Sequence, residues 1–184
     1  MVQPYPAGLL LPSDAYDTSR HQVMGRRVAG LQLAQAVTAD LQAGEQLTLV
    51  GSSADDLHSL ATGLHPRLRP EARLQLSTRL DATALAALGA LHVPDPGLAH
   101  WCQLRGGQPV NAWSLTGVIH TLCSSNVTRA LEELLTAPLH PWDALVCTSQ
   151  AGRQVVEAAL DGQHEALQRR RQQLLEGPGH VAGA

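Results

Sequence analysis

The chain contains no lysine and no phenylalanine, and aromatic residues make up only 3% of its 184 residues. Without lysine it cannot build the P-loop type of phosphate site, which requires that side chain. Charged residues are also scarce, at 16%, and the formal net charge is -3. Nucleic-acid binding normally requires a basic surface, so we expect no nucleic-acid partner.

Long apolar runs and paired cysteines are missing as well. The apolar run near the start covers only residues 9–11, whereas a membrane-spanning helix needs about 20 apolar residues. No basic leader precedes this run. The three cysteines (Cys102, Cys123 and Cys147) are odd in number and form no C-x-x-C pair, which favours reduced thiols over a disulfide framework. We therefore expect a cytoplasmic protein without a transmembrane segment.

Several common catalytic signatures are absent. The nine histidines show no metal-binding spacing, and the sequence has neither a G-x-S-x-G elbow nor a G-x-G-x-x-G turn. We therefore expect no metal ion and no resident cofactor.

Short apolar segments alternate with helical patterns along the chain. The spacing predicts strands at residues 8–12, 46–50, 73–78, 90–93, 113–122 and 144–149, and helices at 23–42, 54–64, 81–89, 98–104 and 151–175, with a further helix opened by Ser124 and Ser125. This alternation indicates an α/β domain with a doubly wound, mainly parallel, Rossmann-like sheet. We expect this single domain to cover residues 1–175 and residues 176–184 to form a disordered tail.

Residues 113–149 form the centre of this organisation. They predict a buried strand ending near His120, a helix, a connector containing prolines and a second buried strand. Parallel sheets of this class bind ligands beyond the carboxyl ends of their strands. We therefore expect the loops at residues 13–25, 51–55, 92–95, 120–125 and 148–149 to share one crevice.

Three features within these loops each allow two interpretations. His120 is either a hydrogen-bonded core residue or a site residue supported by Thr121 and the serines that open the next helix. Residues 51–53 (GSS) form either a phosphate-binding turn or a tight turn with a serine cap. Residues 12–27 form either a long capped loop or a loop that faces substrate.

Three longer segments resemble a known enzyme family. They are SDAYDTSRHQVMGRRVAG (13–30), SLTGVIHTLCSS (114–125) and APLHPWDALVCTSQAGRQVVEAAL (137–160). Their order and content are similar to bacterial retaining glycosyltransferases of family four, in a branch with the motifs D-x-Y-D-T-S…M-G-R, S-L-x-G-x-x-H-T and P-W-D-A-L-x-C-T-S. The resemblance extends over most of residues 8–167.

The resemblance implies that the chain is the N-terminal, acceptor-side half of a GT-B architecture. Such enzymes transfer a sugar from a sugar nucleotide to an acceptor. By this resemblance His120 is the catalytic residue, hydrogen-bonded to the donor hexose at the reacting centre. Asp14 and Asp17 would bind acceptor hydroxyls and Arg26 a donor phosphate, while Thr121 and Ser149 would line the substrate cleft.

In this family the sugar nucleotide, a co-substrate, is held mainly by a second, C-terminal domain, which we expect to lie outside these residues. The chain alone would then be inactive, and we expect a homo-oligomer or a partner chain that carries the donor domain. The alternative is a stand-alone Rossmann-like binding or interaction module without catalysis. A third possibility, a small nucleotide- or phosphate-binding enzyme, depends on residues 51–55 alone.

Overall fold

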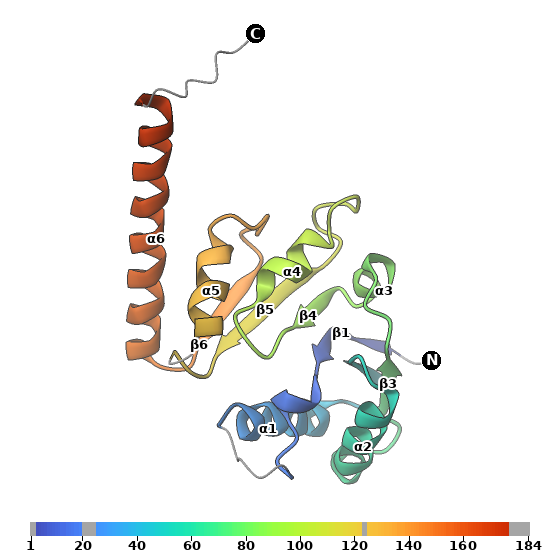
Figure 1. Cartoon of the computed structure of the whole chain (residues 1–184). Helices are drawn as coiled ribbons and strands as arrows, with labels where there is room; N and C mark the ends of the chain where they lie inside the picture. Colours follow the sequence, from blue (N-terminus) through green and yellow to red (C-terminus); the bar gives the residue numbers. More distant parts are fainter. Residues whose placement is uncertain (1–2, 20–24, 123–124, 177–184) are drawn as a thin grey trace.

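The computed structural model describes residues 3–19, 25–122 and 125–176, and confirms the predicted doubly wound α/β fold (Figure 1). All six strands of the sheet are parallel, and their order is β3-β2-β1-β4-β5-β6. This is the strand order of Rossmann dinucleotide-binding domains. The strands are β1 (Gln3–Leu10), β2 (Glu45–Val50), β3 (Arg73–Ser77), β4 (Ala90–His92), β5 (Ser114–Ile119) and β6 (Ala144–Cys147).

Helices cover both faces of the sheet. They are α1 (Gly25–Asp40), α2 (Ala54–Leu64), α3 (Ala82–Ala86), α4 (Leu98–Gln103), α5 (Ser125–Leu134) and α6 (Gln150–Glu176), with 3-10 turns η1 (Ser13–Ala15) and η2 (His65–Arg67). Leu9 and Leu49 face the core under α1 and α2, whereas their neighbours Leu10 and Val50 face the core under α3 and α4. Successive strand residues point to opposite faces, so these apolar runs stabilise both layers.

The first strand begins earlier than the apolar pattern predicts, at Gln3 instead of residue 8. Its first half pairs with β2 through Gln3 and Pro4, whereas pairing with β4 begins only at Gly8. The first half of β1 therefore has one free edge, where prolines can be accommodated in a strand. Sequence reasoning stopped at the prolines because it could not locate this free edge.

The predicted helices agree with the structure more closely. Helix α2 covers the predicted residues, and the Ser53 hydroxyl accepts a hydrogen bond from the Asp56 amide (3.2 Å) at its start. Helix α3 is shorter than predicted. Asp81 caps it by accepting from the Ala84 amide (3.0 Å), and the chain turns into β4 at Gly89, whose φ is +74°. A residue with a Cβ is strained at that φ, so glycine favours the turn.

The prediction that β6 is a buried strand is wrong. Ala144 and Val146 are exposed, and 48% of the Val146 surface is accessible. Leu145 and Cys147 point to the opposite face, where they pack in the core formed with α5 and α6. The reason is topological: β6 is an edge strand, and helices cover one of its faces within the described residues. An apolar run of four residues cannot distinguish a buried strand from such an edge strand.

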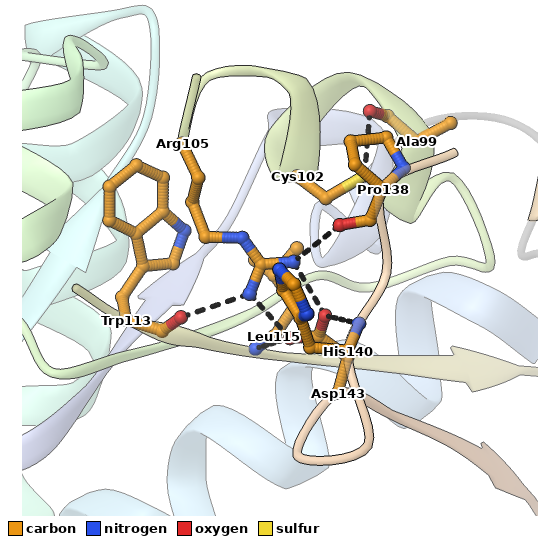
Figure 2. Close-up of polar contacts among 8 residues, drawn as sticks. All are labelled: Ala99, Cys102, Arg105, Trp113, Leu115, Pro138, His140 and Asp143. Carbon is orange, nitrogen blue, oxygen red and sulfur yellow. Dashed lines mark hydrogen bonds and ion pairs between the residues drawn. The ribbon is translucent and has the colours of Figure 1, made fainter. Parts of the chain in front are cut away.

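A buried ion pair joins the segments that lead into β5 and β6 (Figure 2). The Arg105 guanidinium donates two parallel hydrogen bonds to the Asp143 carboxylate, at 2.9 and 2.5 Å, and both side chains are at least 96% buried. The same guanidinium also donates to the carbonyl oxygens of Trp113 (3.1 Å) and Pro138 (3.2 Å). The two terminal nitrogens of the guanidinium are thus fully engaged, whereas the buried Nε has no hydrogen-bond partner among the described residues. Bidentate bonding with additional acceptors of this kind is what allows a charged pair to remain inside a protein.

The Asp143 carboxylate is also bonded to the backbone. It accepts from the amides of Leu115 and His140, each at 2.9 Å. Leu115 lies near the start of β5, and Asp143 immediately precedes β6. The pair therefore fixes the two strands side by side at their amino ends, and their carboxyl ends carry the loops described below.

Every helix within the described ranges is too short or too polar to cross a bilayer. Glu176, where the predicted tail begins, is the last residue of α6. Residues 177–184 lie outside the described part of the chain, as do His21, Met24 and Cys123.

Candidate functional site

The sheet order places its switch point between β1 and β4, where the direction of strand succession reverses. Three charged residues meet there. Arg26, at the start of α1, lies 3.2 Å from the Asp14 carboxylate and 3.3 Å from the Asp95 carboxylate. Asp14 belongs to the turn after β1 and Asp95 to the loop after β4. The triad thus bridges the two loops that border the switch point.

The loop that carries Asp95 has a defined shape. One Asp95 carboxylate oxygen accepts from the Gly97 amide (2.8 Å), which leaves the other oxygen to pair with Arg26. The loop also rests on β5, since a Cβ on Gly117 would lie 2.7 Å from the Asp95 carbonyl oxygen. Only glycine permits this close approach. Gly117 is the glycine of the S-L-x-G-x-x-H-T segment, so the motif positions the Asp95 loop.

His120 directly follows β5 at the same carboxyl edge. The Thr148 hydroxyl, at the end of β6, donates to the Ile119 carbonyl oxygen (3.1 Å) and holds this strand end in place. The half-buried His120 lines a pocket of about 510 Å³ together with Arg26, Asp95 and residues of α5. Small-molecule sites in proteins have volumes in this range.

The environment of His120 favours the neutral imidazole. Burial lowers the pKa of His120, the nearby Arg26 cation lowers it further, and the Asp95 carboxylate opposes both effects. A neutral imidazole has one donor and one acceptor nitrogen. At neutral pH, His120 can therefore exchange hydrogen bonds with ligand hydroxyls without the cost of placing a second cation beside Arg26.

A second histidine lies near the switch point. His92, the last residue of β4, shares a hydrogen bond between its Nδ1 and the Thr116 hydroxyl (2.9 Å). Burial lowers the pKa of His92, and the proximity of His120 lowers it further. The buried Nε2 atom of His92 has no hydrogen-bond partner among the described residues. Sequence reasoning included residue 92 in a candidate loop but assigned it no role.

The residues predicted for the site are only partly brought together. His120, Arg26 and Thr121 line the pocket, and Asp14 is paired with Arg26. Asp17 lies instead in a turn, where it accepts from the Ser19 hydroxyl (2.6 Å), and it borders a separate hollow over α1 and α2.

Ser149 borders a third hollow, between β6 and α6, and its hydroxyl accepts from the Gly152 amide (3.0 Å) at the start of α6. The single crevice expected from the sequence is therefore divided, because Asp17 and Ser149 take part in local caps and turns.

The turn at residues 51–53 has the geometry of the capped-turn interpretation. Ser53 caps α2, as described above, and Gly51 is buried against the Leu57 side chain and the Leu11 backbone. Phosphate-binding turns need backbone amides that face open space. The Gly51 amide already donates to the Ser77 carbonyl oxygen (3.1 Å).

Sequence reasoning did not select Asp95, Arg105 or Asp143 as residues with a specific role. Asp95 was visible only as part of a strand-ending P-D-P-G turn, and Asp143 only as a letter of the P-W-D-A-L segment. Asp95 pairs with Arg26, which lies 69 positions earlier in the chain. Arg105 and Asp143 pair with each other across 38 positions. The only sequence signal was that a charged residue stood beside an apolar strand.

Two carboxylates have a spacing that resembles a donor-site motif. Glu157 and Glu165 are separated by seven residues, the E-x(7)-E pattern that family-four enzymes use for the nucleotide sugar. Both lie on exposed turns of α6 and pair with arginines four positions away, Arg153 (2.7 Å) and Arg169 (3.4 Å). They face none of the pocket residues around His120, so this spacing carries no functional assignment. Across the described ranges, no three His, Cys, Asp or Glu side chains converge as a metal site.

Comparison of the chain with protein-family models, with curated proteins and with solved structures found no match.

Proposed function

We propose that this chain is the acceptor-side domain of a retaining glycosyltransferase, which transfers a sugar from a sugar nucleotide to an acceptor. The observation that carries the proposal is the pocket at the carboxyl edge of the sheet, where His120, Arg26 and Thr121 meet beside Asp95. These residues come from three separate segments, two of which also carry the family resemblance. The strand order is compatible with a GT-B half, and ligands of such sheets bind at this edge.

The charges beside His120 favour hydroxyl groups over a free phosphate, and the other two charged residues of the pocket, Arg129 and Glu133, balance each other in formal charge. Arg26 already faces two carboxylates, so the triad of Arg26, Asp14 and Asp95 has a net charge of -1. Both carboxylates retain lone pairs that can accept hydrogen bonds from sugar hydroxyls. A donor phosphate at Arg26 would have to displace one of them. In this proposal His120 hydrogen-bonds the donor sugar, and the two aspartates orient hydroxyl groups of the acceptor.

The pocket also requires a covering partner for efficient transfer. Glycosyl transfer needs donor and acceptor held together with water excluded. The His120 side chain is only half-buried and Thr121 is exposed, so the described residues leave this edge accessible to water. We propose that a donor-binding domain covers it, either in the same polypeptide or in a partner chain.

The test combines this chain with a donor-binding domain of a family-four enzyme, by fusion or by mixing, and measures nucleoside diphosphate release over a panel of sugar nucleotides and acceptors. We expect transfer from the combination and none from the chain alone. His120→Ala should lower kcat about 10- to 100-fold, because one hydrogen bond to the reacting sugar is lost. Ser149→Ala is the matched control, since that hydroxyl caps α6 outside the pocket.

Near-normal turnover of His120→Ala would remove this residue from the site. Transfer at enzyme-like rates by the chain alone would contradict the requirement for a donor domain.

A further inference from the structure

Helix α5 supplies a polar wall to the pocket around His120. Leu131 and Leu134 turn one face of the helix into the core, where they pack in the cluster that contains Ile119. A different face, with residues recurring every three or four positions, lines the pocket: Asn126, Arg129, Ala130 and Glu133. Three of these four side chains are polar or charged, so the pocket continues as a polar surface beyond the residues discussed above.

Two arginines line this pocket, and their charges are differently compensated. The Arg26 guanidinium pairs with the carboxylates of both Asp14 and Asp95. The exposed Arg129 forms no ion pair with any residue in the described part of the chain. An anion would have to compete with two carboxylates at Arg26 but with none at Arg129. Arg129 is therefore the better position in the pocket for an anionic group.

Glu133 lines the same pocket but does not pair with Arg129. At the same spacing of four positions in α6, Arg153 and Glu157 do form an ion pair, at 2.7 Å. Along the helix axis Glu133 lies about 6 Å beyond Arg129, whereas Asn126 lies about 4.5 Å nearer the start of α5. The pocket therefore meets the charges of Arg129 and Glu133 separately, one turn of helix apart.

The start of α5 is the end of the helix that lies near His120. The chain enters α5 at Ser125, shortly after Thr121, which also lines the pocket. An anionic group placed between Arg129 and Asn126 is thus on the His120 side of Arg129 and away from Glu133. The Asn126 amide nitrogen can donate to such a group as well.

The two sides of the pocket favour different chemical groups. Beside His120, the triad of Arg26, Asp14 and Asp95 has a net negative charge and favours hydroxyls. At the start of α5, the uncompensated guanidinium of Arg129 favours an anion. Arginine binds a carboxylate or a phosphate through two parallel hydrogen bonds. A ligand that satisfies both sides carries hydroxyl groups on one part and a carboxylate or phosphate on another.

We propose that Arg129 binds an anionic group of the acceptor, so that the acceptor of this domain is an acidic sugar or a sugar phosphate. The inference rests on the proposed function, because it takes the pocket around His120 as the acceptor site. Asn126 supplies a second contact to the anionic group. Arg129 thereby selects the acceptor, whereas the family resemblance assigned an anion, the donor phosphate, to Arg26.

The experiment is an NMR titration of the isolated chain with matched sugars that differ only at the sixth carbon. The sugars are glucose, glucuronate and glucose 6-phosphate, with the same three in the galactose series, and uridine diphosphate represents the donor. We expect at least one acidic sugar to bind at His120 about tenfold more tightly than its neutral parent, because it adds charge-assisted hydrogen bonds. The preference should shrink between about 50 and about 500 mM salt, since Arg129 is exposed. The carboxylate and phosphate members distinguish the two kinds of anion.

Variants of α5 assign the preference to one side chain. Arg129→Gln should lower the ratio of acidic-sugar to neutral-sugar affinity about tenfold. Arg129→Lys should keep part of the ratio, because lysine retains the charge but not the two parallel hydrogen bonds. Arg169→Gln is the matched control, since that exposed arginine pairs with Glu165 on α6, outside the pocket. Thermal unfolding of each variant checks that the fold is retained.

A wild-type affinity ratio in Arg129→Gln would overturn the proposal. A loss of affinity confined to uridine diphosphate would also overturn it, because Arg129 would then belong to the donor site. Equal binding of neutral and acidic sugars at His120 would overturn the selection by charge and leave the proposed function intact. Failure of every sugar to bind at His120 would contradict the acceptor site itself, and this inference with it.

Discussion

The Arg26 guanidinium lies 3.3 Å from the Asp95 carboxylate, and this contact joins the start of α1 to the loop after β4. The two residues are 69 positions apart in the chain. Together they border the pocket that also contains His120, and their opposite charges act on the imidazole in opposite directions.

This relationship predicts opposite changes in the pKa of His120. Arg26→Gln should raise that pKa because it removes a repelling cation, whereas Asp95→Asn should lower it because it removes an attracting anion. The measurement is a proton NMR titration of the His120 ring, assigned by comparison with His120→Gln. Asp14→Asn is the control and should have a smaller effect, since Asp14 contacts Arg26 on another side. Shifts in the same direction for Arg26→Gln and Asp95→Asn would show that the charges do not act on His120 as described.

The lowered pKa values of His92 and His120 predict a pH dependence of stability. As the pH falls below 6.5, these two histidines take up protons in the unfolded chain before they do so in the folded chain, because their pKa values are near 6.5 when unfolded and lower when folded. Well above pH 6.5 both histidines are neutral in the folded and the unfolded chain, so they do not change the free energy of unfolding. That free energy falls as the pH decreases through 6.5 toward the lower pKa values of the folded chain. Urea unfolding at about pH 8 and about pH 5 should show a smaller loss for the His92→Gln, His120→Gln double variant than for the wild type. An equal loss in both proteins would contradict the burial of these rings.

The buried pair predicts a large stability loss when one partner is removed. Arg105→Met should destabilise the fold by about 3–5 kcal/mol, because it leaves the Asp143 carboxylate buried without a cation. For a domain of this size that corresponds to a fall in Tm of roughly 10 °C. The control is Arg79→Met, which breaks the exposed pair with Asp81 and should leave Tm nearly unchanged. A Tm equal to wild type for Arg105→Met would mean that the pair does not hold β5 and β6 together.

Two helical glycines should respond in opposite ways to alanine. A Cβ on Gly30 would lie 2.0 Å from the Ala15 carbonyl oxygen, so Gly30→Ala should separate α1 from η1 at a cost of about 1–3 kcal/mol. Gly63, in α2, has no atom within 4 Å of an added Cβ. Gly63→Ala should therefore stabilise the fold by about 0.5–1 kcal/mol. Denaturant unfolding of both variants measures the two effects, and a stabilised Gly30→Ala would refute the close approach.

The fold could be predicted from the sequence because its signals are local. Apolar residues spaced for α1 and α2, and short runs such as residues 46–50, indicate elements without knowledge of their neighbours. The position of His120 close to a strand end follows from the same reasoning, although the sequence placed it inside the last part of the strand and the structure ends β5 one residue earlier, at Ile119. What could not be predicted is which face or edge of the sheet an element occupies, so the exposed side of β6 and the early start of β1 were missed.

The candidate site was less predictable because its geometry is tertiary. Arg26 was chosen from a family resemblance, but its partner Asp95 is distant in the chain and stood in an ordinary turn. Asp17 and Ser149 were chosen from the same resemblance, yet the structure uses their oxygens as local acceptors for Ser19 and Gly152. A sequence pattern does not distinguish an oxygen that faces a pocket from one that caps a turn.

The most direct test of the account is a two-dimensional NMR titration of the isolated chain with sugar nucleotides and candidate acceptor sugars at millimolar concentrations. The account predicts that at least one compound causes saturable shifts at His120, Arg26 and Thr121, and that His120→Ala abolishes the saturation. It would be contradicted if no compound perturbed these residues, or if the saturable shifts centred on the groove beside Ser149.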